Sequence, residues 1–123
     1  MLAAAPPGPA PNTRRAPRFL VRDPIEVSVD SGHAGIIDMS VLGAQIVSMP
    51  ALRPNQKIKV ALPDTDDVLN LMAQVAWSMF EQTPSTLEPR YRVGIEFTDA
   101  AKQTLEAYRR RYCTEPPIPL RSR

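Results

Sequence analysis

Two short clusters of polar residues, about twenty residues apart, carry the side chains best suited to holding an anionic ligand. The first cluster contains Arg14, Arg15 and Arg18, at the end of an otherwise uncharged N-terminal stretch. Each guanidinium is a planar group of N–H donors that can hydrogen-bond phosphate bidentately and stack on a purine base. The sequence therefore predicts a phosphate-binding segment where the folded part of the chain begins.

The second cluster is Asp38, Ser40 and Gly43. A carboxylate and a hydroxyl two residues apart project from the same face of an extended chain, and the glycine permits a tight turn or the close approach of a ligand. A carboxylate can accept hydrogen bonds from N1–H and the exocyclic amine of guanine. Each cluster alone has an ordinary alternative, a solvated basic segment or a turn built by Asp and Ser, but together they predict a guanine-nucleotide site.

The elements that must position these clusters are strands, because apolar residues alternate with polar ones through most of the chain. The expected strands cover residues 25–30, 33–37, 42–46, 57–62, 68–80 and 90–97. In the longest of them, Trp77 and Met79 are expected to face the core. Six antiparallel strands joined by turns, without helical crossovers, favour a mainly β fold, a small closed barrel.

Helical periodicity follows the last strand. An apolar stripe recurs at i, i+4, i+7 and i+11, and it consists of Ala101, Leu105, Tyr108 and Tyr112. Asp99 is expected to cap this helix, and residues 109–111 place three arginines in its last turn, where the helix dipole favours cations. The sequence predicts that the helix lies across the barrel.

Proline and charge divide the chain into three parts. Eight of the 14 prolines lie in residues 1–17 and 116–123, so the expected organisation is a disordered Ala/Pro-rich tail (1–13), one folded domain (14–112) and a flexible basic tail (113–123). The two ends are basic, whereas the body (residues 23–100) carries five bases and eleven acids. An acidic body argues against a protein that binds long nucleic acids.

Other kinds of site find little support. His33, Asp38 and Ser40 have the residue types of a hydrolytic triad, but the serine has no nucleophile-elbow context, so no enzyme is expected. Three acids, Asp64, Asp66 and Asp67, do not follow a calcium-loop pattern, and the lone Cys113 excludes a thiolate zinc site. We expect no metal and no cofactor. The start of the chain lacks a signal-peptide pattern, and no uncharged run could span a bilayer, so the expectation is a soluble cytoplasmic protein without membrane insertion.

The two clusters, in this order and spacing, resemble the PilZ family of bacterial cyclic di-GMP receptors. The family pattern is RxxxR followed by [D/N]xSxxG, which Arg14, Arg18, Asp38, Ser40 and Gly43 match. Residues 91–97, YRVGIEF, look like the final strand of the family. The resemblance covers about residues 14–112 and implies a six-stranded barrel with a C-terminal helix. Many members carry an arginine directly before RxxxR; here that position is Thr13, while Arg15 lies inside the motif.

The resemblance also implies a function. The arginines would contact phosphates and stack on guanine, Asp38 and Ser40 would bind the guanine edge, and Gly43 would leave room for the ligand. The expected protein is a cyclic di-GMP receptor whose Arg-rich segment becomes ordered on binding and which then signals through a partner protein. Two alternatives remain: a PilZ-like interaction module that binds no nucleotide, and a nucleic-acid-binding barrel, which the acidic body disfavours.

Overall fold

The structure is a computed structural model that describes residues 16–30, 32–82, 89–115 and 117–119. The predicted tail (1–13) and two of the predicted ligand-binding residues, Arg14 and Arg15, lie outside the described residues. The described elements are β1 (Phe19–Val29), β2 (Gly32–Met39), β3 (Gly43–Ser48), β4 (Lys57–Asp64), β5 (Asp67–Glu81), β6 (Arg90–Phe97) and α1 (Lys102–Tyr112).

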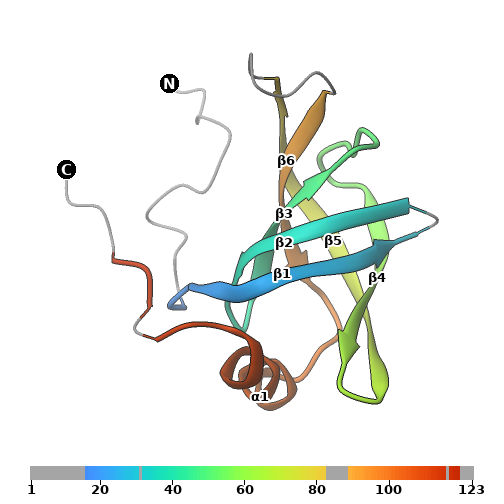
Figure 1. Ribbon diagram of the computed structural model, residues 1–123. Helices are drawn as coiled ribbons and strands as arrows, with labels where there is room; N and C mark the ends of the chain where they lie inside the picture. The colour runs from blue at the N-terminus through green and yellow to red at the C-terminus, as the bar shows by residue number, and fades with distance from the viewer. Residues whose placement is uncertain (1–15, 31, 83–88, 116, 120–123) are drawn as a thin grey trace.

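The six strands form a closed antiparallel barrel in the order β1-β2-β3-β6-β5-β4 (Figure 1). The ring closes between β1 and β4, where Ser28 pairs with Ala61 and Val29 with Val60. Closure matters because it pairs the two outermost strands of the sheet with each other, so that each strand of the ring has a neighbour on both sides. The prediction of a six-stranded antiparallel barrel with a C-terminal helix is therefore confirmed.

The barrel interior holds the alternating apolar residues of all six strands, among them Val27, Ile46, Val60, Val75 and Val93. The predicted core positions at the end of β5 do not join them. Met79 is 39% exposed and Trp77 is only half-buried. The register of β5 against β6 shifts between Val75 and Trp77, and beyond this irregularity the β5–β6 hairpin projects past the barrel (Figure 1). Phe80, which follows Met79 there, is 55% exposed.

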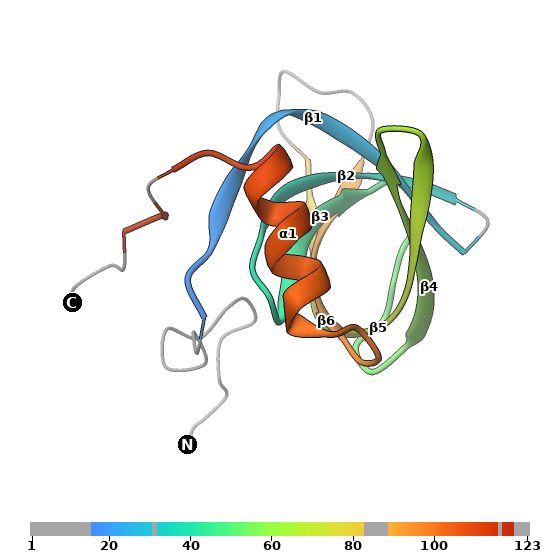
Figure 2. The same ribbon diagram turned by 90° about the horizontal axis from the view of Figure 1, so that it is seen from below.

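Helix α1 lies across one end of the barrel (Figure 2). Leu105 and Tyr108 are fully buried, and the Tyr108 hydroxyl donates to the Pro63 carbonyl at 2.6 Å. The predicted cap is wrong, because the N-cap residue is Ala101 and no side chain caps the helix. Asp99 instead accepts the backbone N–H of Met72 at 2.9 Å, so its carboxylate is used by β5.

The residues after α1 pair with the start of β1. Cys113 forms a β-bridge with Val21, Thr114 N donates to the Leu20 carbonyl at 2.7 Å, and Ile118 N donates to the Arg18 carbonyl at 2.7 Å. The predicted flexible tail from residue 113 is therefore attached to the barrel in its described residues. The reason lies in the sheet. β4 pairs with β1 only at Ser28 and Val29, near the C-terminal end of β1, so the backbone carbonyls at the start of β1 need other hydrogen-bond donors.

Candidate functional site

The fold brings Arg18, the described residue of the first predicted cluster, next to the second cluster. Arg18 directly precedes β1, and Asp38 lies near the end of β2. Because Leu20 pairs with Asp38, Arg18 and Asp38 lie side by side. Arg18 Nε donates to Asp38 Oδ1 at 3.2 Å. The Asp38 side chain is only 5% exposed and that of Arg18 is 16% exposed. Residues twenty positions apart in the sequence thus form one charged contact at the barrel surface.

A residue that the sequence analysis missed holds the other oxygen of this carboxylate. Gln45, opposite Asp38 on β3, donates from Nε2 to Asp38 Oδ2 at 2.9 Å. Its own carbonyl oxygen accepts a hydrogen bond from Arg92 Nη1 on β6 at 3.4 Å. Arg92 in turn pairs with Glu81 through Nη2 at 3.1 Å. The signal available in the sequence was positional: Gln45 alternates with the inward-facing Ala44 and Ile46.

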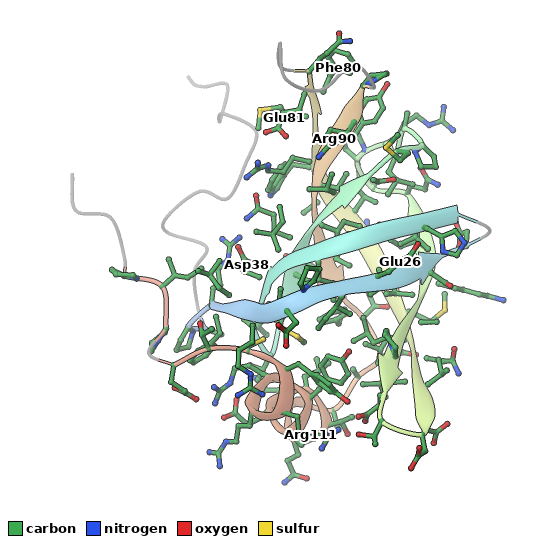
Figure 3. The ribbon with its side chains drawn as sticks, viewed as in Figure 1. Glu26, Asp38, Phe80, Glu81, Arg90 and Arg111 are labelled. Atoms are coloured by element: carbon green, nitrogen blue, oxygen red, sulfur yellow. The ribbon has the colours of Figure 1, made fainter. Side chains whose placement is uncertain are left out.

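This polar row therefore runs from the start of β1 across β2, β3 and β6 to the end of β5. In Figure 3, Asp38 lies where β2 ends, and Glu81 lies further along the molecule at the far end of the β5–β6 hairpin. A row of alternating cations, carboxylates and one amide offers a ligand both donors and acceptors. It can therefore hold a phosphate and the polar edge of a base next to each other.

Ser40 builds the tight turn between β2 and β3. Its Oγ accepts the backbone N–H groups of Leu42 (3.0 Å) and Gly43 (3.3 Å), and its own N–H donates to the Gly43 carbonyl at 2.8 Å. The turn-building role that is ordinary for such a serine is present here. It fixes the spacing between Asp38 and the first residue of β3.

Gly43 has a structural reason that is independent of any ligand. A Cβ at this position would lie 2.1 Å from the Ile95 carbonyl oxygen on β6. A side chain would thus push β3 away from β6, a strand with which β3 is paired from Gly43 to Ser48. The sheet itself requires glycine here, a reason distinct from the two that the sequence suggested, a tight turn or the close approach of a ligand.

Two other candidate groups, His33 and Cys113, form no hydrogen bond with the described residues of this row. His33 is exposed at the start of β2 beside Glu26, with Nδ1 and Oε2 3.5 Å apart, whereas Ser40 follows the opposite end of that strand. Cys113 is buried, and burial raises the pKa of its thiol to about 11.

Within the described ranges, no three His, Cys, Asp or Glu residues group as metal ligands. In the same residues, no helix combines the length and apolarity that a membrane span needs.

The comparisons with known proteins agree with this geometry. No curated protein matches the chain. Among solved structures, the PilZ domain with c-di-GMP of YcgR from Escherichia coli aligns with a TM-score of 0.65 at 13% identity, covering 78% of this chain and 88% of that one. The Bacillus subtilis inhibitor of motility (MotI/DgrA) aligns with a TM-score of 0.59 at 16% identity, covering 80% of this chain and 50% of that one.

At these identities the two structures establish a shared fold. The family itself is shown by the sequence, because the model of the PilZ domain matches residues 12–114, which is most of the chain. The match includes the arginine segment, the Asp38–Gly43 turn and the whole barrel and helix. The chain belongs to the PilZ domain family.

Proposed function

We propose that this protein is a receptor for cyclic di-GMP and that Arg18, Asp38 and Ser40, together with Arg14 and Arg15, form its ligand site. The observation that carries the proposal is the contact between Arg18 Nε and Asp38 Oδ1 at 3.2 Å. It joins a phosphate-binding group to a guanine-binding group at one point of the surface. Cyclic di-GMP carries both phosphates and guanines, so one ligand would use both groups.

Arg18 also covers the carboxylate in this state. Asp38 is buried beneath it, so a guanine reaches the carboxylate only after the guanidinium moves aside. A phosphate of the ligand then replaces Asp38 as the partner of Arg18, and the donors of guanine replace Arg18 at Asp38, so neither charged group is left without a hydrogen bond. Each Asp38 oxygen has two acceptor positions, so the carboxylate can keep Gln45 while it accepts N1–H and the amine of guanine.

The proposed signal passes to another protein in the cytoplasm. When Arg14, Arg15 and Arg18 close over the ligand, the nucleotide and the ordered segment create a surface that the free protein lacks. A partner that contacts this surface would bind the occupied form more tightly and would in turn raise the affinity for the nucleotide. The E. coli structure, described as a PilZ domain with c-di-GMP, supports the choice of ligand.

The decisive experiment is a calorimetric titration with cyclic di-GMP, with cyclic di-AMP and GTP as controls. Adenine presents an acceptor at N1, so Asp38 would face a lone pair, and we expect cyclic di-AMP to bind at least a hundredfold more weakly. Asp38→Ala should weaken cyclic di-GMP binding and narrow the gap between the two dinucleotides. Circular dichroism of each variant checks that the barrel is intact.

Two results would contradict the proposal in different ways. Absence of binding at high micromolar cyclic di-GMP would favour the alternative of an interaction module that binds no nucleotide. Full guanine preference in Asp38→Ala would show that the carboxylate only supports the fold and that base recognition resides elsewhere.

A further inference from the structure

The amide of Gln45 has one defined orientation. Its Nε2 donates to Asp38 Oδ2 at 2.9 Å, and its Oε1 accepts from Arg92 Nη1 at 3.4 Å. A flipped amide would bring its oxygen against the carboxylate and its N–H₂ against the guanidinium, so both contacts would become repulsive. The pairing of Arg92 with Glu81 at 3.1 Å holds the guanidinium in this position.

This orientation leaves one N–H of Gln45 next to the two acceptor oxygens of Asp38. A primary amide has two N–H groups, and Gln45 uses one of them on Asp38. Its second N–H therefore lies adjacent to a carboxylate with two oxygens. On β6, the residue opposite Gln45 is Gly94, which has no side chain of its own, and the indole of Trp77 on β5 lies over it. Asp38 and Gln45 together present two acceptors and a donor.

Guanine has the complementary arrangement along its Watson–Crick edge: two donors, the exocyclic amine and N1–H, followed by the acceptor O6. A carboxylate alone satisfies the two donors and leaves O6 to water. We propose that Gln45 donates to guanine O6 and so completes the recognition of the base, with Arg92 as a positioning residue that fixes the amide. This inference rests on the proposed cyclic di-GMP site.

A matched pair of ligands isolates the O6 contact. The probes are cyclic di-GMP and its 6-thioguanine analogue, in which sulfur, a weak acceptor, replaces O6. The wild type should bind the thio analogue about tenfold more weakly, the usual effect of one lost hydrogen bond. Gln45→Met, which keeps the length of the side chain but has no donor, should bind cyclic di-GMP about tenfold more weakly and should bind both ligands equally.

Arg92 should affect the difference in affinity between the two ligands only through Gln45. Arg92→Leu frees the amide of Gln45 to flip. We therefore expect this variant to bind the thio analogue about threefold more weakly than cyclic di-GMP, a difference between those of the wild type and Gln45→Met. Arg92→Lys keeps a cation that can donate to Gln45 Oε1, so this variant should regain most of the tenfold difference in affinity between the two ligands. Gln103→Leu, which removes the same functional group from an exposed position on α1, is the control and should behave like the wild type.

The outcomes separate this inference from the proposed function. If the wild type binds no cyclic di-GMP, both are overturned. If the wild type binds it and Gln45→Met still binds the thio analogue tenfold more weakly than cyclic di-GMP, only the role of Gln45 is overturned. If Gln45→Met does not fold, Gln45→Leu makes the same test, because it is apolar, similar in size and lacks the amide donor.

Discussion

Two largely buried arginines, Arg18 and Arg109, use their side chains in different ways. Arg109 donates from Nε and Nη2 to the Glu106 carboxylate and from Nη1 to Glu115 at 2.5 Å. Its guanidinium also stacks on the Phe19 ring, 3.8 Å from the ring centre. Arg18, among the described residues, donates a single side-chain hydrogen bond, from Nε to Asp38.

The difference separates a structural arginine from one suited to a ligand. Every nitrogen of the Arg109 guanidinium has a carboxylate partner, so the side chain joins α1, the residues after it and β1 into one unit. Arg18 is fixed by one nitrogen, and its exposed fraction of 16% exceeds the 6% of Arg109. An anion can therefore engage the remaining N–H groups of Arg18 without breaking the fold.

The largest expected effect on stability is that of Arg109→Met. The variant keeps much of the apolar stem but loses three charge-assisted hydrogen bonds and the stacking on Phe19. We expect the free energy of unfolding to fall by about 2–3 kcal/mol, as measured by urea denaturation. Cyclic di-GMP affinity of the folded variant should stay within about twofold of the wild type. A tenfold loss of affinity would show that the two arginines are not separate in function.

Arg18→Ala should give the reverse result. Removal of the proposed phosphate contact should weaken cyclic di-GMP binding by about ten- to a hundredfold in calorimetry. Stability should fall by about 1 kcal/mol only, because Gln45 still bonds Asp38 and loss of the covering side chain lets water reach the carboxylate. A stability loss as large as that of Arg109→Met, with unchanged affinity, would make Arg18 a structural residue.

The smallest expected effect is a pH dependence located at Glu106. Hydrogen bonds from Arg109, and then from Arg110, lower the pKa of Glu106 from 4.5 to about 2. A carboxyl whose pKa is lower in the folded state stabilises the protein above its unfolded pKa, and this contribution is lost as pH falls through the folded pKa. Because the side chain is 35% exposed, screening reduces the effect to about 1 kcal/mol.

Urea denaturation at a series of pH values tests this assignment. The wild type should lose stability as pH falls from about 5 to about 2, following the two pKa values of Glu106. Glu106→Gln should be less stable at neutral pH and should show a flatter profile over that range. An unchanged profile in Glu106→Gln would assign the acid sensitivity to other carboxyl groups.

The sequence was sufficient for the barrel because alternation is a local signal that each strand carries by itself. The Arg18–Asp38 contact was also accessible, since both residues belong to motifs whose spacing is typical of the family. Gln45 was not accessible, because a single glutamine carries no pattern, and its role depends on which residue of β2 lies opposite it. Register across strands is a property of the folded sheet.

Two features that the sequence did not indicate have a common cause in tertiary structure. Asp99 has the right residue type for a cap, but the free N–H of Met72 on β5 uses its carboxylate. Thr114 and Ile118 belong to a segment with the composition of a tail, yet their N–H groups donate to the carbonyls of Leu20 and Arg18. In both cases a backbone group on a strand needed a partner, and sequence patterns do not reveal such needs.

The pairing of Ile118 with Arg18 has a practical consequence for measuring occupancy. A fluorescent dye on a cysteine introduced at the exposed Pro119 would lie one residue from Ile118, whose N–H donates to the carbonyl of Arg18, the proposed ligand-binding arginine. The native thiol would not compete for the dye, since Cys113 is buried and its pKa is about 11. The protein therefore lends itself to a single-dye biosensor, in which a change in emission would report the proposed binding of cyclic di-GMP at Arg18.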